Sequence, residues 1–195
     1  MPPFSAILLA AGRSTRMGRD KALLEIGGVA QWCRQRDVLA AAGAVEIFLS
    51  ARPEQEWARA AAGFTAVVHD ALESGGPMVG VAAGLERATH PWLAVLAIDL
   101  PAMRPAWFAT LLREVAPGVG VVGRRGEFFE PLAAIYPGEL RWLAWEALAR
   151  GDLSLQRLLA AAVAQGLMRV HEIAPAEAAR FENWNDGVLA PPKPN

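Results

Sequence analysis

The amino-acid sequence predicts an α/β protein: a single domain built on a doubly wound, mostly parallel sheet with helices on both faces. Apolar runs typical of strands alternate with helical patterns along much of the chain, as they do where crossover helices join parallel strands. The first strand is a short, continuous apolar run, which is expected of a strand buried on both faces. A length of 195 residues also fits one domain.

The elements follow one another in a regular order as far as Gly126. We expect strands near 4–10, 45–50, 64–69, 92–98 and 119–123, and helices near 29–42, 53–62, 77–88 and 105–115. After Gly126 we expect a strand at 129–136, helices at 138–150 and 154–165, and a strand at 168–173. The domain is predicted to span residues 1–189, with a flexible tail at 190–195. Gly80 and Gly84, one helical turn apart, are expected to let their helix pack closely on the sheet.

Composition and charge exclude several classes of function. The net charge of −1 and the pI near 6.3 leave no basic surplus, so we expect no nucleic-acid partner. The amino-terminal segment has neither a basic region nor an apolar run long enough for a membrane span, so we expect a cytoplasmic protein without a membrane partner. Cys33 is the only cysteine, and the three histidines lack ligand spacing, so neither a disulfide nor a zinc site is expected.

A glycine-rich, basic loop follows the first strand. It contains Gly12, Arg13, Ser14, Arg16, Gly18, Arg19 and Lys21. Backbone N–H groups and several positive charges in such a loop suit a polyphosphate. Lys21 is notable because the only other lysine is Lys193, which indicates that a compact ammonium group is needed at this position. The alternative is a solvated lysine at the start of a helix.

Polar residues stand at the ends of the next three strands. Ser50 and Arg52 follow the second strand, Asp70 the third and Asp99 the fourth. In parallel sheets ligands bind beyond the carboxyl ends of the strands, where the strand order reverses. Asp99 offers a hard oxygen ligand for Mg²⁺, which typically takes one or two protein carboxylates and completes its shell with phosphate oxygens and water. A simple turn aspartate ahead of Pro101 is the alternative.

The segment before the third helix is a second candidate for contact with a ligand. Gly75 and Gly76 allow close approach of the backbone, and Pro77 suits the first turn of a helix. Asp70 precedes this segment, so base recognition and plain helix capping both stay open.

The run from Leu9 to Lys21 matches the motif L-A-[AG]-G-x-S-x-R-M-G-x-x-K and resembles the first loop of nucleotidyltransferases. The later segments 130–136, 151–155 and 181–186 occur in the order found in molybdenum cofactor guanylyltransferases of the MobA type. The resemblance covers nearly the whole chain and implies the Rossmann-like nucleotidyltransferase fold. The family's final N-x-N-T-P-x-D element is altered here, but Asn183 and Asn185 remain and are candidates for binding the acceptor.

The resemblance implies transfer of GMP from GTP to the terminal phosphate of molybdopterin, with release of pyrophosphate. Mg²⁺ bound by Asp99 would bridge the triphosphate, and the catalytic residues would be Lys21, Asp99 and Arg16. The nucleotide-binding residues would be Leu9, Ala10, Ala11, Gly12, Arg13, Lys21, Ser50, Asp70, Gly76 and Asp99. Transient contact with proteins of molybdenum cofactor biosynthesis or with molybdoenzymes is compatible with this role.

Three alternatives compete with guanylyl transfer. Ala11 is common in the related cytidylyltransferases, whereas the segment Gly76–Val81 resembles the guanylyl branch, so GTP is expected ahead of CTP. A nucleotidyltransferase with another small acceptor, such as a sugar 1-phosphate, would share the first loop. A nucleotide-binding sensor without activity would not need the carboxylate of Asp99.

Overall fold

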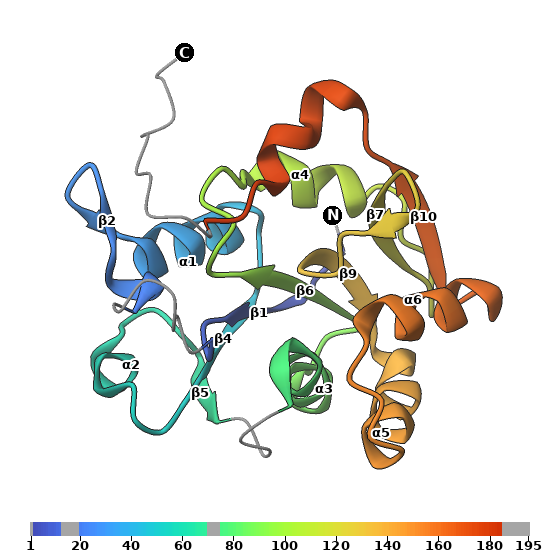
Figure 1. Cartoon of the computed structure of the whole chain (residues 1–195), viewed down its shortest axis with the longest axis horizontal. Helices are drawn as coiled ribbons and strands as arrows, with labels where there is room; N and C mark the ends of the chain where they lie inside the picture. Colours follow the sequence, from blue (N-terminus) through green and yellow to red (C-terminus); the bar gives the residue numbers. More distant parts are fainter. Residues whose placement is uncertain (1, 13–19, 70–74, 185–195) are drawn as a thin grey trace.

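A central mixed sheet organises the protein (Figure 1). The computed structural model describes residues 2–12, 20–69 and 75–184. Within them the strand order is β10-β7-β9-β6-β1-β4-β5, with β8 paired to β7 at one margin. The strands are β1 (Ser5–Leu9), β4 (Glu46–Ala51), β5 (Ala66–His69), β6 (Trp92–Ala97), β7 (Gly120–Arg125), β8 (Phe128–Phe129), β9 (Ala133–Pro137) and β10 (Met168–Glu172).

The buried strand β1 forms the middle of the sheet. It pairs in parallel with β4 on one side and β6 on the other, so that Leu9 stands level with Ser50 and Ala97. Successive side chains of a strand point to opposite faces. Ala6 and Leu8 accordingly enter one apolar cluster and Ile7 and Leu9 the other. The prediction of a strand buried on both faces is confirmed.

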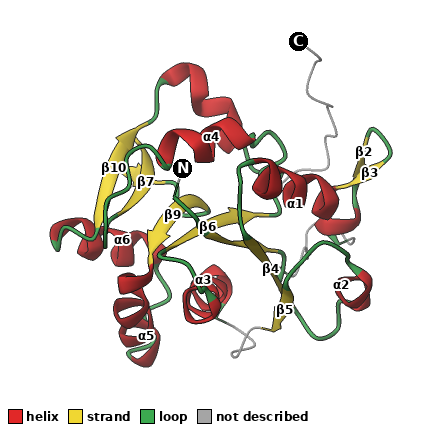
Figure 2. Ribbon diagram, turned by 180° about the vertical axis from the view of Figure 1, so that it is seen from behind, coloured by secondary structure: helices red, strands yellow, loops and turns green. Residues whose placement is uncertain are grey.

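Helices cover both faces of this sheet. Figures 1 and 2 show α1 and α4 on one face and α3, α5 and α6 on the other. The two apolar clusters agree with this division, since Trp107 of α4 belongs to the same cluster as Leu8, and Val81 of α3 belongs to the same cluster as Ile7. The helices are α1 (Gln31–Ala41), α2 (Glu56–Ala60), α3 (Gly76–Arg87), α4 (Pro105–Leu111), α5 (Arg141–Ala149) and α6 (Leu155–Ala164).

The strand order reverses beside β1. The chain passes from β1 to β4 and β5 on one side and then returns to place β6 on the other side of β1. At such a reversal the two crossover helices lie on opposite faces, which leaves a crevice at the carboxyl ends of the strands. The mostly parallel sheet is confirmed, with β9 as the antiparallel member between β6 and β7.

Among the strands, two features differ from the expected elements. The strand expected at 129–136 is divided into β8 and β9, because a turn at Glu130 and Pro131 interrupts the pairing and Ala133 donates its N–H to the Glu130 carbonyl. A small hairpin of β2 (Glu25–Ile26) and β3 (Val29–Ala30), closed by Gly27 and Gly28 with positive φ, was not expected. The boundary at residue 189 and the tail at 190–195 lie outside the described residues. No helix in the described ranges is long and apolar enough to cross a membrane.

Candidate functional site

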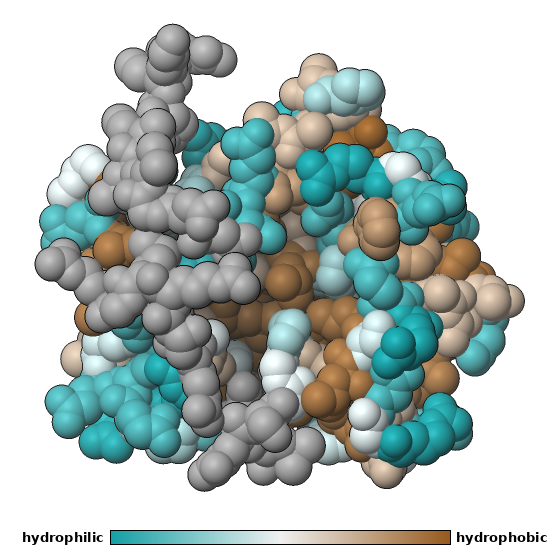
Figure 3. Space-filling model, in the orientation of Figure 1, coloured by the Kyte–Doolittle hydropathy of each residue, from teal (hydrophilic) through white to brown (hydrophobic). Residues whose placement is uncertain are grey.

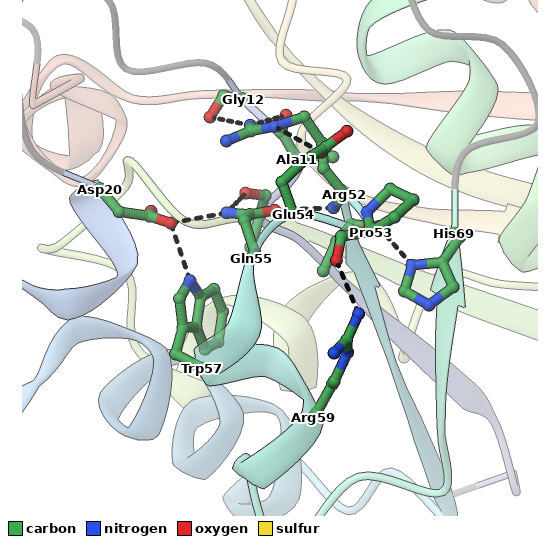
Figure 4. A network of polar contacts seen from close by, with 12 residues as sticks. Ala11, Gly12, Asp20, Arg52, Pro53, Glu54, Gln55, Trp57, Arg59 and His69 are labelled. Atoms are coloured by element: carbon green, nitrogen blue, oxygen red, sulfur yellow. Dashed lines mark hydrogen bonds and ion pairs between the residues drawn. The ribbon is translucent and has the colours of Figure 1, made fainter.

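An arginine binds the carbonyl groups of the peptides just after β1. The Arg52 guanidinium donates to the carbonyls of Ala11 and Gly12, the latter at 2.7 Å (Figure 4). In a planar trans peptide the C=O and the following N–H point in opposite directions. The N–H of Gly12 therefore faces away from Arg52, and Gly12 itself is exposed, with no atom of the described residues within 4 Å of the position a Cβ would take. Within the described part of the chain, Gly12 thus presents a backbone N–H directed away from Arg52.

Lys21 and Asp99 lie together at this edge of the sheet. Lys21 begins a short 3₁₀ helix, Lys21–Leu23, which the Asp20 carboxylate caps by accepting the Ala22 N–H at 3.1 Å. The Nζ of Lys21 is 3.7 Å from Oδ2 of Asp99, and these side chains are 14% and 25% exposed. The arrangement places a cation and an anion side by side beyond the carboxyl ends of β1 and β6.

Four contacts fix the backbone around Asp99. The Ile98 N–H donates to the Leu9 carbonyl at 3.0 Å, which ties this turn to β1. Two buried side chains of α1 hold the same turn: Gln31 donates to the Ile98 carbonyl at 3.0 Å and Gln35 to the Leu100 carbonyl at 2.6 Å. The carbonyl of Asp99 itself accepts the Trp184 N–H at 2.9 Å. The carboxylate thus stands on a rigid turn.

The Asp99 carboxylate has the features of a ligand for a hard cation. Its Oδ1 atom is buried and has no hydrogen-bond partner among the described residues. A buried acceptor left unpaired is costly, about 1–3 kcal/mol, and such a cost is common at functional sites. The described residues contain no group of three or more histidine, cysteine or acidic side chains able to hold a metal. A single carboxylate fits Mg²⁺, whose other ligands come from phosphate and water.

The Trp184 contact also brings the carboxyl-terminal segment to this edge. Trp184 is buried, whereas Asn183 is exposed next to it. The candidate acceptor-binding residue Asn183 therefore lies one residue from a direct backbone contact with Asp99. Figure 3 shows a recessed, largely apolar area at the centre of the molecule, where β6 runs in Figure 1.

Leu9 and Ser50 lie beneath α3. Ser50 is only 1% exposed, and a Cβ on Gly80 would stand 3.1 Å from its Oγ and 2.7 Å from Cδ2 of Leu9. Gly80 therefore allows α3 to pack closely on β1 and β4, as the sequence indicated. Gly84 does the same one turn later, where a Cβ would stand 2.9 Å from Cδ2 of Leu93. Any contact of Leu9 or Ser50 with a nucleotide would need the backbone or a shift of α3.

The remaining candidate site residues differ in exposure, and some of them are not described by the structure. Gly76 is exposed at the amino-terminal end of α3, with φ of +58°, a conformation that favours glycine. Ala10 is buried and is bonded through both its N–H, to Ser50, and its carbonyl, to Gln55. The candidates Arg13, Arg16, Asp70 and Asn185 lie outside the described residues.

Sequence reasoning missed the polar residues that support this site. Gln31, Gln35 and Gln55 are buried side chains at 0%, 1% and 5% exposure. Asp20, next to Lys21, joins Gln55 in a hydrogen-bonded network (Figure 4). Two glutamines four residues apart on an otherwise apolar helix face were the available signal, because buried glutamine is uncommon without a hydrogen-bonding task.

The protein belongs to the Rossmann-like class of α/β proteins. Its sheet is mostly parallel and reverses its strand order, and a lysine and a carboxylate lie at the carboxyl edge of that sheet. Residues 6–169 match the family model of the MobA-like NTP transferase domain, so the chain belongs to that family and is a nucleotidyltransferase. The resemblance drawn from the first loop is confirmed.

Individual relatives agree with this assignment. A probable molybdenum cofactor guanylyltransferase of Opitutus terrae is 43% identical over 91% of this chain and 88% of its own length. A molybdenum cofactor guanylyltransferase of Pseudomonas putida is 35% identical over 85% of this chain and 87% of its own length.

Solved structures share the fold. Molybdopterin-guanine dinucleotide biosynthesis protein A of Archaeoglobus fulgidus has a TM-score of 0.74 at 16% identity, covering 94% of this chain and 93% of its own. A 2-C-methyl-D-erythritol 4-phosphate cytidylyltransferase of Thermus thermophilus has a TM-score of 0.63 at 18% identity, covering 90% and 91%. At these identities the likeness is one of fold alone, so it does not choose between nucleotides.

Proposed function

We propose that this protein transfers GMP from GTP to the terminal phosphate of molybdopterin and releases pyrophosphate. The observation that supports it most strongly is the pair of Lys21 and Asp99, 3.7 Å apart at the edge of the sheet where the exposed Gly12 follows β1. The chain's 43% identity to a probable molybdenum cofactor guanylyltransferase supplies the substrate class.

The reaction depends on alignment of the two phosphate groups and neutralisation of their charge more than on proton transfer. The acceptor phosphate already carries a nucleophilic oxygen, which attacks the α-phosphorus of GTP while the bond to the bridging oxygen of pyrophosphate breaks. In this proposal Lys21 stabilises negative charge that develops on the phosphates, and the N–H of Gly12, whose peptide group Arg52 holds, is a further donor. No general base is needed.

We infer that Asp99 holds Mg²⁺ when nucleotide is bound. The buried Oδ1 of Asp99, which has no hydrogen-bond partner among the described residues, supports this role, and the phosphates of GTP would supply the further ligands. The ion would contribute further charge neutralisation at the triphosphate. The Lys21 ammonium lies 3.7 Å from the other carboxylate oxygen, Oδ2, so Oδ1 is the atom that would hold the metal.

Guanylyl transfer and its alternative, cytidylyl transfer, differ in the nucleotide base that the site accepts. Two relatives at 43% and 35% identity are named as guanylyltransferases, which favours GTP although Ala11 is the residue common in cytidylyltransferases. The methyl group of Ala11 is a small feature, because one methyl group changes discrimination by only about 1–3 kcal/mol. A site that pairs the N1–H and N2–H₂ donors of guanine discriminates more strongly.

The test is pyrophosphate release with molybdopterin as acceptor and GTP, CTP or ATP as donor. We expect kcat/KM to be highest for GTP, by more than the roughly 200-fold that one methyl group can supply, because a hydrogen-bonding site rejects a partner that lacks its donors by about 10⁴- to 10⁵-fold. A preference for CTP would make the protein a cytidylyltransferase. No turnover with any of the three, together with tight nucleotide binding, would refute molybdopterin as the acceptor or indicate a sensor.

A further inference from the structure

The carboxylate of Asp20, adjacent to Lys21, is held by three donors. Its Oδ1 accepts the Ala22 N–H at 3.1 Å. Its Oδ2 accepts both the Gln55 amide and the Trp57 indole N–H, each at 2.7 Å (Figure 4). Capping a three-residue helix needs only the first of these bonds. The other two come from a different segment, Gln55 just before α2 and Trp57 within α2, and fix Asp20 in space.

Gln55 connects Asp20 to the end of the central strand. Its amide nitrogen donates to the Ala10 carbonyl at 3.0 Å as well as to Asp20, and its Oε1 accepts the Arg52 N–H at 2.7 Å. The side chain is buried and uses both of its polar atoms. One amide therefore sets the separation between the start of the loop, at Ala10, and its end, just before Lys21.

Trp57 connects Asp20 to helix α1. Its ring stacks on Trp32 of α1, with centroids 6.1 Å apart and planes inclined by 24°. The same helix presents Gln31 and Gln35 to the backbone on either side of Asp99. Asp20 is thus fixed relative to α1, the same helix that holds the turn at Asp99.

We propose that Asp20 is a positioning residue for catalysis: through Gln55 and Trp57 it holds Lys21 opposite Asp99. The inference rests on the proposed function, in which the Lys21 ammonium stabilises charge on the phosphates. Lysine has a long, flexible side chain, so the placement of its ammonium depends on how firmly its backbone is held. A displacement of about 1 Å at a reacting centre can lower the rate about 100-fold.

The test is Asp20→Asn, measured alone and in a Lys21→Ala background. Asparagine keeps one oxygen and replaces the other with a donor, so it cannot accept from Ala22 and from the two side chains together. We expect kcat to fall about 10- to 100-fold, with the KM for GTP changed less than about threefold. In the Lys21→Ala background we expect Asp20→Asn to cause no further loss, because a residue that acts through Lys21 has nothing left to position.

Two further variants keep the test decisive. Asp37→Asn changes an exposed carboxylate on α1 that pairs with Arg36, and it should leave activity and the melting temperature unchanged. Trp57→Phe removes one donor to Asp20 while retaining an aromatic ring for stacking on Trp32, and it should lower kcat less than Asp20→Asn does. It serves as the readout if Asp20→Asn does not fold.

The outcomes separate this inference from the proposed function. If Lys21→Ala lowers kcat about 100- to 1,000-fold while folded Asp20→Asn and Trp57→Phe retain wild-type kcat, the positioning role is overturned and the proposed function stands. If the losses from Asp20→Asn and Lys21→Ala multiply, Asp20 acts independently of Lys21 and the inference is equally overturned. If Lys21→Ala is fully active, the proposed role of Lys21 fails first, and the positioning role fails with it.

Discussion

Replacement of Lys21 by alanine separates catalysis from stability most cleanly. The ammonium is 3.7 Å from the Asp99 carboxylate, and two unit charges about 4 Å apart interact by about 4 kcal/mol at an effective dielectric constant near 20. A phosphate oxygen at a comparable distance would interact with Lys21 on the same scale. Removal of one preorganised electrostatic contact costs about 2.7–4 kcal/mol in activation free energy, or about 100- to 1,000-fold in kcat. We expect a loss of that size for Lys21→Ala.

The same substitution should affect folding far less. Both side chains reach solvent, at 14% and 25% exposure, so the ion pair contributes about 1 kcal/mol or less to stability. For a chain of this size, 1 kcal/mol shifts the melting temperature by about 2–4 °C.

The assay is pyrophosphate release with GTP, Mg²⁺ and molybdopterin, beside thermal unfolding of the same samples. Lys21→Arg should recover only part of the rate, because the guanidinium is a planar fork rather than a compact charge. A loss of less than about threefold in Lys21→Ala would refute the reasoning, and a loss accompanied by unfolding would attribute it to stability.

Two further predictions concern metal and acid. Asp99→Asn should bind Mg²⁺ with nucleotide much more weakly, checked by isothermal titration; an unchanged metal dependence of turnover would leave Asp99 as a turn residue only. Burial opposes the charge of Glu46, but hydrogen bonds from Ser5 and Thr89 outweigh it and hold the pKa of Glu46 below its ordinary 4.5. This stabilisation is full above pH 4.5 and is lost as the pH falls through the depressed pKa. In Glu46→Gln, the free energy of unfolding measured in urea should therefore depend less on pH between pH 3 and pH 6 than in the wild type. An unchanged dependence on pH would contradict this.

The sheet and its helices were predictable because their apolar patterns are local. The strand from Trp92 to Ala97 is buried throughout, so its sequence alone marks it. The hairpin at 25–30 was not predictable in this way, since its strands have two residues each and bury no apolar face. The interruption before β9 depends on one turn at Pro131 within an otherwise continuous strand pattern.

The candidate site was predictable in part for a related reason. Lys21 stands in a motif and Asp99 at the end of a buried strand, and the rule that ligands bind at the carboxyl edge of parallel strands brings the two positions together. The supporting glutamines follow no such rule. Gln31 donates to the carbonyl of Ile98 and Gln55 to the carbonyl of Ala10. Because every residue type has a backbone carbonyl, the sequence at positions 98 and 10 does not reveal these partners.

Helix α1 explains why these distant residues meet in a fixed arrangement. Its first residue, Gln31, donates its backbone N–H to the Leu24 carbonyl at 2.8 Å, just after the helical turn of Lys21, and its side chain to Ile98, just before Asp99. The Oε1 of Gln31 is buried and has no partner among the described residues, at a cost of about 1–3 kcal/mol. An apolar residue would avoid that cost but would release the Ile98 carbonyl. A buried polar group kept at such a cost is consistent with a site in which the placement of charge matters more than stability.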